Sequence, residues 1–148
     1  MCSGATRLAR PRAIQWTEDV VAIRIVRLGS PRAKHEGVRI GTVRRPPRGV
    51  PKSEFASRDF YDVWLPNLAP SEALVKAALA AEDEKAWRAF TKRYRAEMSR
   101  PEPRRVLDLL AAFSHSSDFS VGCYCQNEQR CHRSVLRELL RDRNARIS

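Results

Sequence analysis

The sequence predicts a single α/β domain with a central, mainly parallel sheet of about four or more strands flanked by helices. Short β-branched runs alternate with helical stretches along the chain. An apolar run that contains Val121 leads directly into a helix start near Cys131. The length of 148 residues is that of one domain with a real core. This alternation is typical of parallel α/β sheets, in which ligands gather beyond the carboxyl ends of the strands.

The chain is strongly basic. It carries 28 basic and 17 acidic residues, a formal charge of +11, and 23 of the basic residues are arginine. The first 60 residues hold 13 basic and 5 acidic side chains. Arginine suits phosphate or carboxylate recognition because its planar guanidinium donates two parallel hydrogen bonds. A genome rich in G and C also favours arginine codons, so the composition by itself does not select a partner.

Residues 1–19 are expected to form a basic, flexible tail, and residues 20–148 to form the domain. The tail contains Arg7, Arg10 and Arg12 but lacks the apolar core of a signal peptide. No segment approaches the roughly 20 apolar residues of a membrane span. The four cysteines are too few and too clustered for a secreted disulfide scaffold. These features predict a cytoplasmic protein with no membrane partner.

Three strand candidates precede the helices. Residues 20–28 are β-branched and then alternate apolar side chains with arginine until Gly-Ser-Pro ends the run. Residues 60–65 form the third candidate. The second, residues 37–43, is expected to place on one face Val38, Ile40 and Thr42.

A proline-rich loop follows the second strand candidate. The run Arg44-Arg45-Pro46-Pro47-Arg48-Gly49-Val50-Pro51 contains three prolines and a glycine, which exclude regular structure. Three arginines on an exposed loop make it a candidate anion-binding segment.

Two helices are predicted in the middle of the chain, at residues 71–81 and 84–99. Ser71 and Asp83 are suitable N-caps for them. The second helix has an apolar stripe at three- and four-residue spacing, which predicts a core face more strongly than a ligand site. Its members are Trp87, Phe90, Tyr94 and Met98.

Two further helices complete the prediction. Pro101 and Pro103 precede the third helix, whose expected inward residues are Val106, Leu107, Leu110 and Phe113. The final helix starts at Cys131 and is expected to bury Val135, Leu136, Leu139 and Leu140.

The segment at residues 119–133 is the main candidate site, because a buried strand, a polar loop and a helix start follow one another there. Cys131 falls in the first helical turn, where the helix dipole and neighbouring basic residues favour a thiolate or a bound anion. His132 and Arg133 follow it, and either could instead cap the helix or face water. Glu128 is available to pair with either of them.

Covalent chemistry at this segment is only weakly indicated. Phosphatase and sulfurtransferase loops have a cysteine, about five residues and then an arginine after a strand. Here four residues separate Cys125 from Arg130, which is one short of that spacing. The sequence therefore leaves open whether any reaction takes place.

Zinc or iron binding is the alternative interpretation of the same residues. Cys123 and Cys125 point the same way on a strand, and with Cys131 and His132 they form a set of soft ligands. The C-x-x-C spacing common in zinc knuckles is absent. Cysteines on a buried strand also serve simply as small apolar residues.

With these residues in view, the chain resembles the bacterial family of domains of unknown function numbered 488, DUF488, which includes the YeaO-like proteins. The resemblance extends over residues 23–140 and rests on four stretches, 47–50, 64–71, 87–97 and Cys125 with the Cys131-His132-Arg133 triplet. It implies a small, cytosolic, single-domain α/β protein and no particular activity. The polar features that it carries over are the triplet together with Arg48 and Gly49.

Two features of the chain depart from this family pattern. YeaO-like members usually have Asp-Arg-Leu-Trp-Pro-Arg-Gly where this chain has residues 44–49, so the acidic residue and the tryptophan are lost. Cys123 is an addition to the pattern. The first departure makes the expected pocket more basic.

The leading hypothesis is a basic pocket for a phosphate-bearing ligand, either a nucleotide or a nucleic-acid end. In it Cys131, His132 and Arg133 form the reactive or catalytic group. A metal-binding or thiol-sensing protein without catalysis is the alternative, and broad nucleic-acid binding through the first 60 residues is a third. The pocket's expected ligand-binding residues are Arg44, Arg45, Arg48, Gly49, Cys125 and Glu128.

Overall fold

The computed structural model describes residues 21–148, so the expected basic tail lies outside the described residues. Four parallel strands form one sheet in the order β1-β4-β2-β3. The predicted α/β class with a parallel sheet is confirmed. The strands are β1 (Ile23–Arg27), β2 (Val38–Gly41), β3 (Val63–Trp64) and β4 (Phe119–Cys123). Strands β1, β2 and β3 are shorter than their sequence candidates, and β3 keeps only two residues of the predicted six.

The helices begin and end close to the predicted positions, except that Pro101 and Pro103, which were expected to precede the third helix, lie in its first turn, where proline is tolerated. Ser71 accepts a hydrogen bond from the backbone N–H of Leu74, and Asp83 accepts one from that of Ala86, so both predicted N-caps are confirmed. The helices are α1 (Glu72–Ala80), α2 (Glu84–Met98), α3 (Pro101–Phe113) and α4 (His132–Arg141). None of the helices in residues 21–148 is long and apolar enough to span a membrane.

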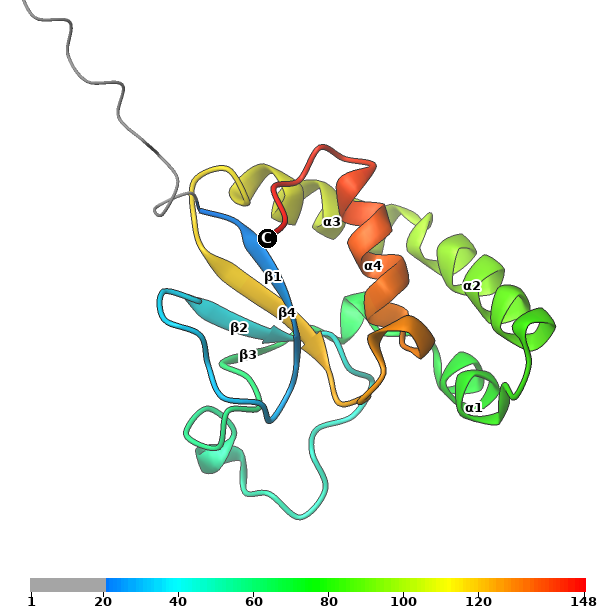
Figure 1. The fold of residues 1–148 in the computed structure, drawn as a ribbon, viewed down its shortest axis with the longest axis horizontal. Coiled ribbons are helices and arrows are strands. Elements are labelled where there is room, and N and C mark those ends of the chain that lie inside the picture. Colours follow the sequence, from blue (N-terminus) through cyan, green and yellow to red (C-terminus); the bar gives the residue numbers. More distant parts are fainter. Residues whose placement is uncertain (1–20) are drawn as a thin grey trace, which may run out of the picture.

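The helices lie together on one side of the sheet, whereas the segment between β2 and β3 loops out below the strands in this view (Figure 1). Ile23, Val121 and Phe119 face the helices and pack with Phe90 and Tyr94 of α2 in the main core. The predicted apolar stripe of α2 is therefore core. The expected flanking of the sheet by helices holds for this face only.

The other face of the sheet carries a buried ion pair that the sequence pattern did not predict. Arg39 of β2 is fully buried and donates to both carboxylate oxygens of Glu36, at 2.7 and 2.9 Å. Ser120 of β4 donates to the same carboxylate at 3.0 Å. Loop residues cover this face and enclose the Arg39 side chain. On the opposite face Val38 and Ile40 pair with Phe119 and Val121, as their expected common face requires, but Val38 is 48% exposed whereas Ile40 packs against the main core.

Phe113 was expected to point inward from α3, but its side chain is 50% exposed. The buried side of α3 is centred on Leu107, Leu110 and Ala111. Phe113 lies near the edge of that side at about 100° per residue, and in the last turn of the helix. The other predicted core residues of α3 and α4 are buried or partly buried in the main core.

Candidate metal and anion site

Three cysteines converge at the carboxyl edge of the sheet. Cys123 ends β4, Cys125 follows it, and Cys131 is the N-cap of α4. Their sulfur atoms all lie within 4.8 Å of one another, and those of Cys123 and Cys125 are 3.8 Å apart. Cys123 and Cys131 are buried, whereas Cys125 is partly exposed, and all three are free thiols. Chain geometry thus gathers three sulfurs from two elements and the turn between them.

His132 is held by the sheet and lies beside the sulfurs. Its Nε2 atom donates to the carbonyl oxygen of Thr42 at 2.8 Å, which leaves Nδ1 facing the Cys131 sulfur at 3.9 Å. The edge of the Tyr94 ring packs against the imidazole, with the centroids 5.5 Å apart. The side chain is buried, so it neither caps the helix nor faces water. It also lies outside the group of converging ligand atoms, which the three cysteines alone form.

Arg133 is buried with its charge next to Cys125. It is 4% exposed, and its Nη2 atom donates to the carbonyl oxygen of Cys125 at 2.6 Å. Its Nε atom is buried without a hydrogen-bond partner. The hydroxyl of Tyr61, whose ring belongs to the same small core as Cys123 and Cys131, is buried and unpartnered as well. Unsatisfied buried polar atoms are costly, so these two atoms are the unusual polar features of this part of the fold.

The three thiols do not ionise alike. Hydrogen bonds from Cys123 and Cys131 lower the pKa of Cys125 to about 3, and the Arg133 guanidinium favours the same thiolate. The hydrogen bond with Cys125 raises the pKa of Cys123. The pKa of Cys131 is lowered, mainly by its hydrogen bond with Cys123 and further by His132. Negative charge therefore collects on Cys125, the least buried of the three cysteines.

The proline-rich loop reaches this segment through its backbone. The hydroxyl of Tyr124, between two of the cysteines, donates to the carbonyl oxygen of Arg45 at 3.1 Å. The Arg45 side chain instead pairs with Glu72 at the start of α1. Arg48 and Gly49 are exposed, and Gly49 has a φ of +70°, which favours glycine. The loop thus contacts the cysteine segment without bringing the Arg45 guanidinium to the sulfurs.

Arg44 and Glu128 have structural partners. The Arg44 guanidinium donates to the carbonyl oxygens of Pro66, Ala69 and Pro70 at 3.0 to 3.3 Å. It also lines a hollow of about 530 Å³ whose walls include none of the cysteines. Glu128 pairs with Arg137 at 2.7 Å, so the expectation that it pairs with His132 or Arg133 is wrong.

Sequence patterns missed several residues around the sulfurs. Thr42 holds His132, Tyr124 joins the loop to the cysteine segment, and Tyr61 supplies the second orphaned atom. Thr42 follows directly after β2, and position at a strand's carboxyl end is a signal that could have found it. Tyr61 comes from an irregular segment that carries no such signal.

A comparison with known protein families shows which family the chain belongs to. The family model described as the active DUF488-N3 subclade matches residues 23–144. The chain belongs to the DUF488 family. The match includes the three converging cysteines, His132 and Arg133. No curated protein and no solved structure gives a significant match to this DUF488 chain.

Proposed function

We propose that this DUF488 protein binds a thiophilic metal ion, zinc in the first place, through Cys123, Cys125 and Cys131. The convergence of three sulfur atoms within 4.8 Å carries the proposal. Zinc binds thiolates at about 2.3 Å, so two sulfurs of a tetrahedral site lie roughly 3.8 Å apart. The separation of the Cys123 and Cys125 sulfurs is 3.8 Å. Iron also accepts thiolate ligands and is the second metal to test.

The surroundings of the sulfurs fit a metal centre. The lowered pKa values of Cys125 and Cys131 supply thiolates, and the positive charge of Arg133 offsets part of their charge. His132 would orient Cys131 from outside the ligand set, as residues behind metal ligands commonly do. Three protein ligands leave a fourth tetrahedral position for water or another ligand. We also propose a cytoplasmic location, where thiols stay reduced.

Elemental analysis of protein purified without a histidine tag tests the metal proposal. The wild type should contain about one zinc or iron per chain, and Cys125→Ser and Cys131→Ser should lose it because two ligands remain. Cobalt loading should produce thiolate-to-cobalt charge-transfer absorption in the wild type and not in these variants. His115→Ala removes an exposed imidazole outside the three converging cysteines and is the control that should keep the metal. A metal-free wild type that also fails to bind added zinc would end the proposal.

A phosphate-bearing ligand, such as a nucleotide, is the second proposed occupant of this end of the sheet. The unpartnered Nε atom of Arg133 is the observation that favours it, because a buried guanidinium donor calls for an acceptor. Arg48, exposed on the loop beside Tyr124, is the second cation for such a ligand. The proposed site does not include the Arg44 and Arg45 side chains, because both contact other residues.

Calorimetric titration with inorganic phosphate and nucleotides tests this second proposal. Arg133→Lys keeps the charge but removes the Nε donor, and Arg48→Ala removes the loop cation. Each should weaken binding about tenfold, which is the loss of one charge-assisted hydrogen bond of about 1.4 kcal/mol or more. Arg58→Ala, an exposed arginine that pairs with Glu54, is the matched control. Unchanged affinity in both site variants would contradict the proposal without affecting the metal assignment.

A further inference from the structure

Helix α2 carries a row of exposed cations that the site at the sheet edge does not use. Lys85, Arg88 and Lys92 are exposed and recur at three- and four-residue spacing. At 100° per residue they fall within a sector of about 60°, and at 1.5 Å per residue they span about 10 Å along the helix. We call these three residues the α2 basic row. The row lies on the side of α2 away from Phe90 and Tyr94, which are buried in the core.

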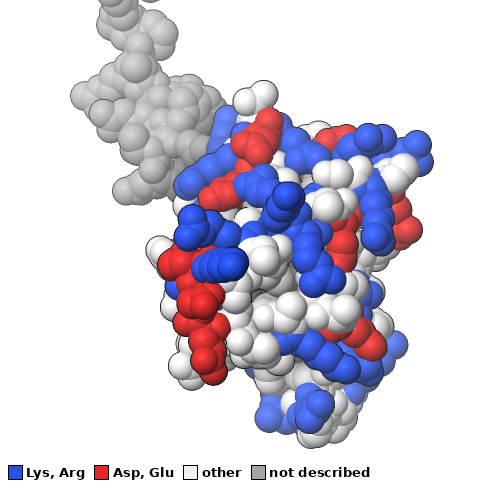
Figure 2. Space-filling model, turned by 90° about the vertical axis from the view of Figure 1, so that its right-hand side faces the viewer, with Lys and Arg blue, Asp and Glu red and all other residues white. Residues whose placement is uncertain are grey.

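The α2 basic row has no acidic partners. None of its members has a carboxylate within 4.0 Å among residues 21–148. The two acidic residues of α2 are engaged elsewhere, because Glu84 pairs with Arg130 and Glu97 accepts the backbone N–H of Ser71. Figure 2 looks onto the side of the molecule that carries α1 and α2, and Lys and Arg extend over much of that face.

The helix gains nothing from this arrangement. Like charges at i, i+3 and i, i+4, such as Arg88 and Lys92, destabilise a helix by about 0.2–0.5 kcal/mol per pair. Lys85 lies in the first turn of α2, where the helix dipole disfavours a cation. The row therefore costs local stability and gains no ion pair in return among residues 21–148.

We propose that the α2 basic row binds the phosphate backbone of nucleic acid without reading its sequence. A row of about 10 Å spans about three phosphate-to-phosphate steps on one strand, at roughly 3.4 Å for each step along the duplex axis. The chain has a formal charge of +11 to attract a polyanion from a distance. A membrane surface fits less well, because the apolar side of α2 is buried in the core and has none left to insert into lipid.

The site and the row lie next to each other in the fold. Arg130, in the turn between Cys125 and Cys131, stacks over the Trp87 ring at 5.7 Å and pairs with Glu84 at the start of α2. The α2 basic row therefore begins close to the place where the turn between Cys125 and Cys131 contacts α2. The proposal concerns this separate surface and does not depend on the metal or on the phosphate-bearing ligand at the sheet edge.

Fluorescence anisotropy with a labelled DNA duplex of about 20 base pairs tests the proposal at several salt concentrations. The row variant replaces Lys85, Arg88 and Lys92 with Gln. The control variant removes three exposed charges elsewhere, with Lys34, Lys52 and Arg141 replaced by Gln. Both variants have the same net charge, so a difference between them reports position and not overall charge.

The row variant should bind about tenfold or more weakly than the wild type at 0.1 M salt, and the control within about twofold. The slope of log K against log salt should fall in magnitude by about 2.7 in the row variant, which is 0.9 for each of three lost phosphate contacts. No binding by the wild type, equal weakening in both variants, or binding to anionic phosphatidylserine vesicles in place of DNA would overturn the proposal. The metal content of the row variant, measured by elemental analysis, should equal that of the wild type. A loss of DNA binding in this variant can therefore be distinguished from a loss of metal.

Discussion

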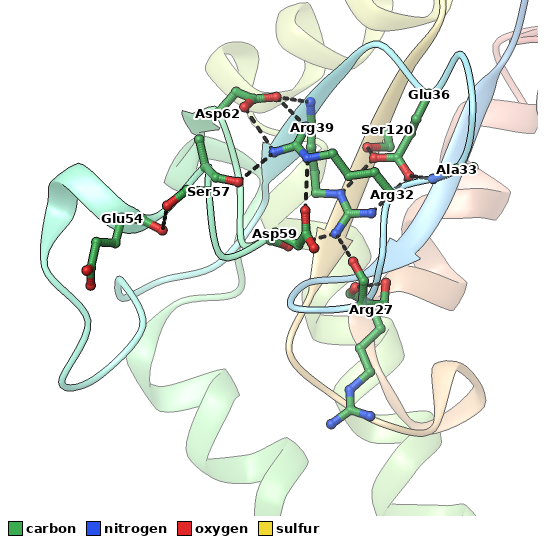
Figure 3. Close-up of polar contacts among 12 residues, drawn as sticks. Arg27, Arg32, Ala33, Glu36, Arg39, Glu54, Ser57, Asp59, Asp62 and Ser120 are labelled. Carbon is green, nitrogen blue, oxygen red and sulfur yellow. Dashed lines mark hydrogen bonds and ion pairs between the residues drawn. The ribbon is translucent and has the colours of Figure 1, made fainter.

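A single buried arginine organises the face of the sheet that the helices leave uncovered. Figure 3 shows the Arg39 and Arg32 guanidinium groups among Glu36, Asp59 and Asp62. Arg39 also donates to the carbonyl oxygens of Ser30 and Asp59 at 2.7 Å, so it joins two loops to β2. Burial would raise the pKa of Glu36, but hydrogen bonds from Arg39, Ala33 and Ser120 outweigh it and lower that pKa. The carboxylate therefore stays charged down to acidic pH.

Replacing Glu36 with Gln should destabilise the fold by about 3–5 kcal/mol, because it leaves the charge of Arg39 buried without a counterion. Since the folded-state pKa of Glu36 lies below the ordinary value of 4.5, its contribution to stability is present above that pH. The contribution is lost as the pH falls through the lowered pKa. Urea unfolding between about pH 3 and 7 should therefore show a flatter pH profile in the variant.

Glu54→Gln is the control for this prediction. Glu54 is exposed and pairs with Arg58 at 3.7 Å, so its loss should change the free energy of unfolding by less than about 1 kcal/mol. Equal effects of the two substitutions would show that the buried Glu36–Arg39 pair contributes no more to the free energy of unfolding than an exposed pair does.

At the scale of elements, β2 and β4 depend on adjacent glycines. Gly41 and Gly122 are paired in register on the face away from the helices. A Cβ atom on Gly41 would lie 2.4 Å from the Tyr61 ring, and one on Gly122 would lie 2.6 Å from the carbonyl oxygen of Val26. The Tyr61 ring therefore packs against β2 because the strand has no side chain at Gly41, and the ring shares the small core of Cys123 and Cys131.

Gly41→Ala should reduce the free energy of unfolding by about 1–3 kcal/mol, the usual cost of overpacking. The cause is contact with the Tyr61 ring, so the same substitution should cost less in a Tyr61→Leu background. A double-mutant cycle from urea unfolding measures this difference as a coupling energy. Equal costs in both backgrounds would mean that the strain comes from another neighbour.

At the scale of the whole molecule, the cysteine cluster joins the sheet to the last helix. Cys123 belongs to β4 and Cys131 to the start of α4, and α4 packs against α2 and α3 in the main core. An ion that binds all three sulfurs would therefore connect both layers. Binding to the folded state alone stabilises a protein by mass action.

Zinc should raise the melting temperature of the metal-stripped protein. A free zinc concentration about 100 times the dissociation constant contributes about 2.7 kcal/mol, which is about 5–10 °C for a domain of this size. Chelation should reverse the shift in calorimetric scans. The Cys131→Ser variant should show little response, and a wild type with the same melting temperature with and without zinc would contradict the proposed centre.

Local patterns in the sequence determined the element order, the parallel α/β class, both helix caps and the core stripe of α2. These features depend on residues near one another in the chain, through periodicity, capping and turn chemistry. The cysteine, histidine and arginine types at the end of β4 also indicated where a site would form.

Tertiary structure alone decided which of these residues meet. Cys131 joins Cys123 and Cys125, while Arg44 and Arg45 contact the residues around the start of α1. Arg39 is buried because loops distant in sequence cover its face of the sheet, and Phe113 is half exposed because none of residues 21–148 covers that edge of α3 fully. Such outcomes depend on contacts between segments far apart in the chain, which periodicity and spacing do not encode.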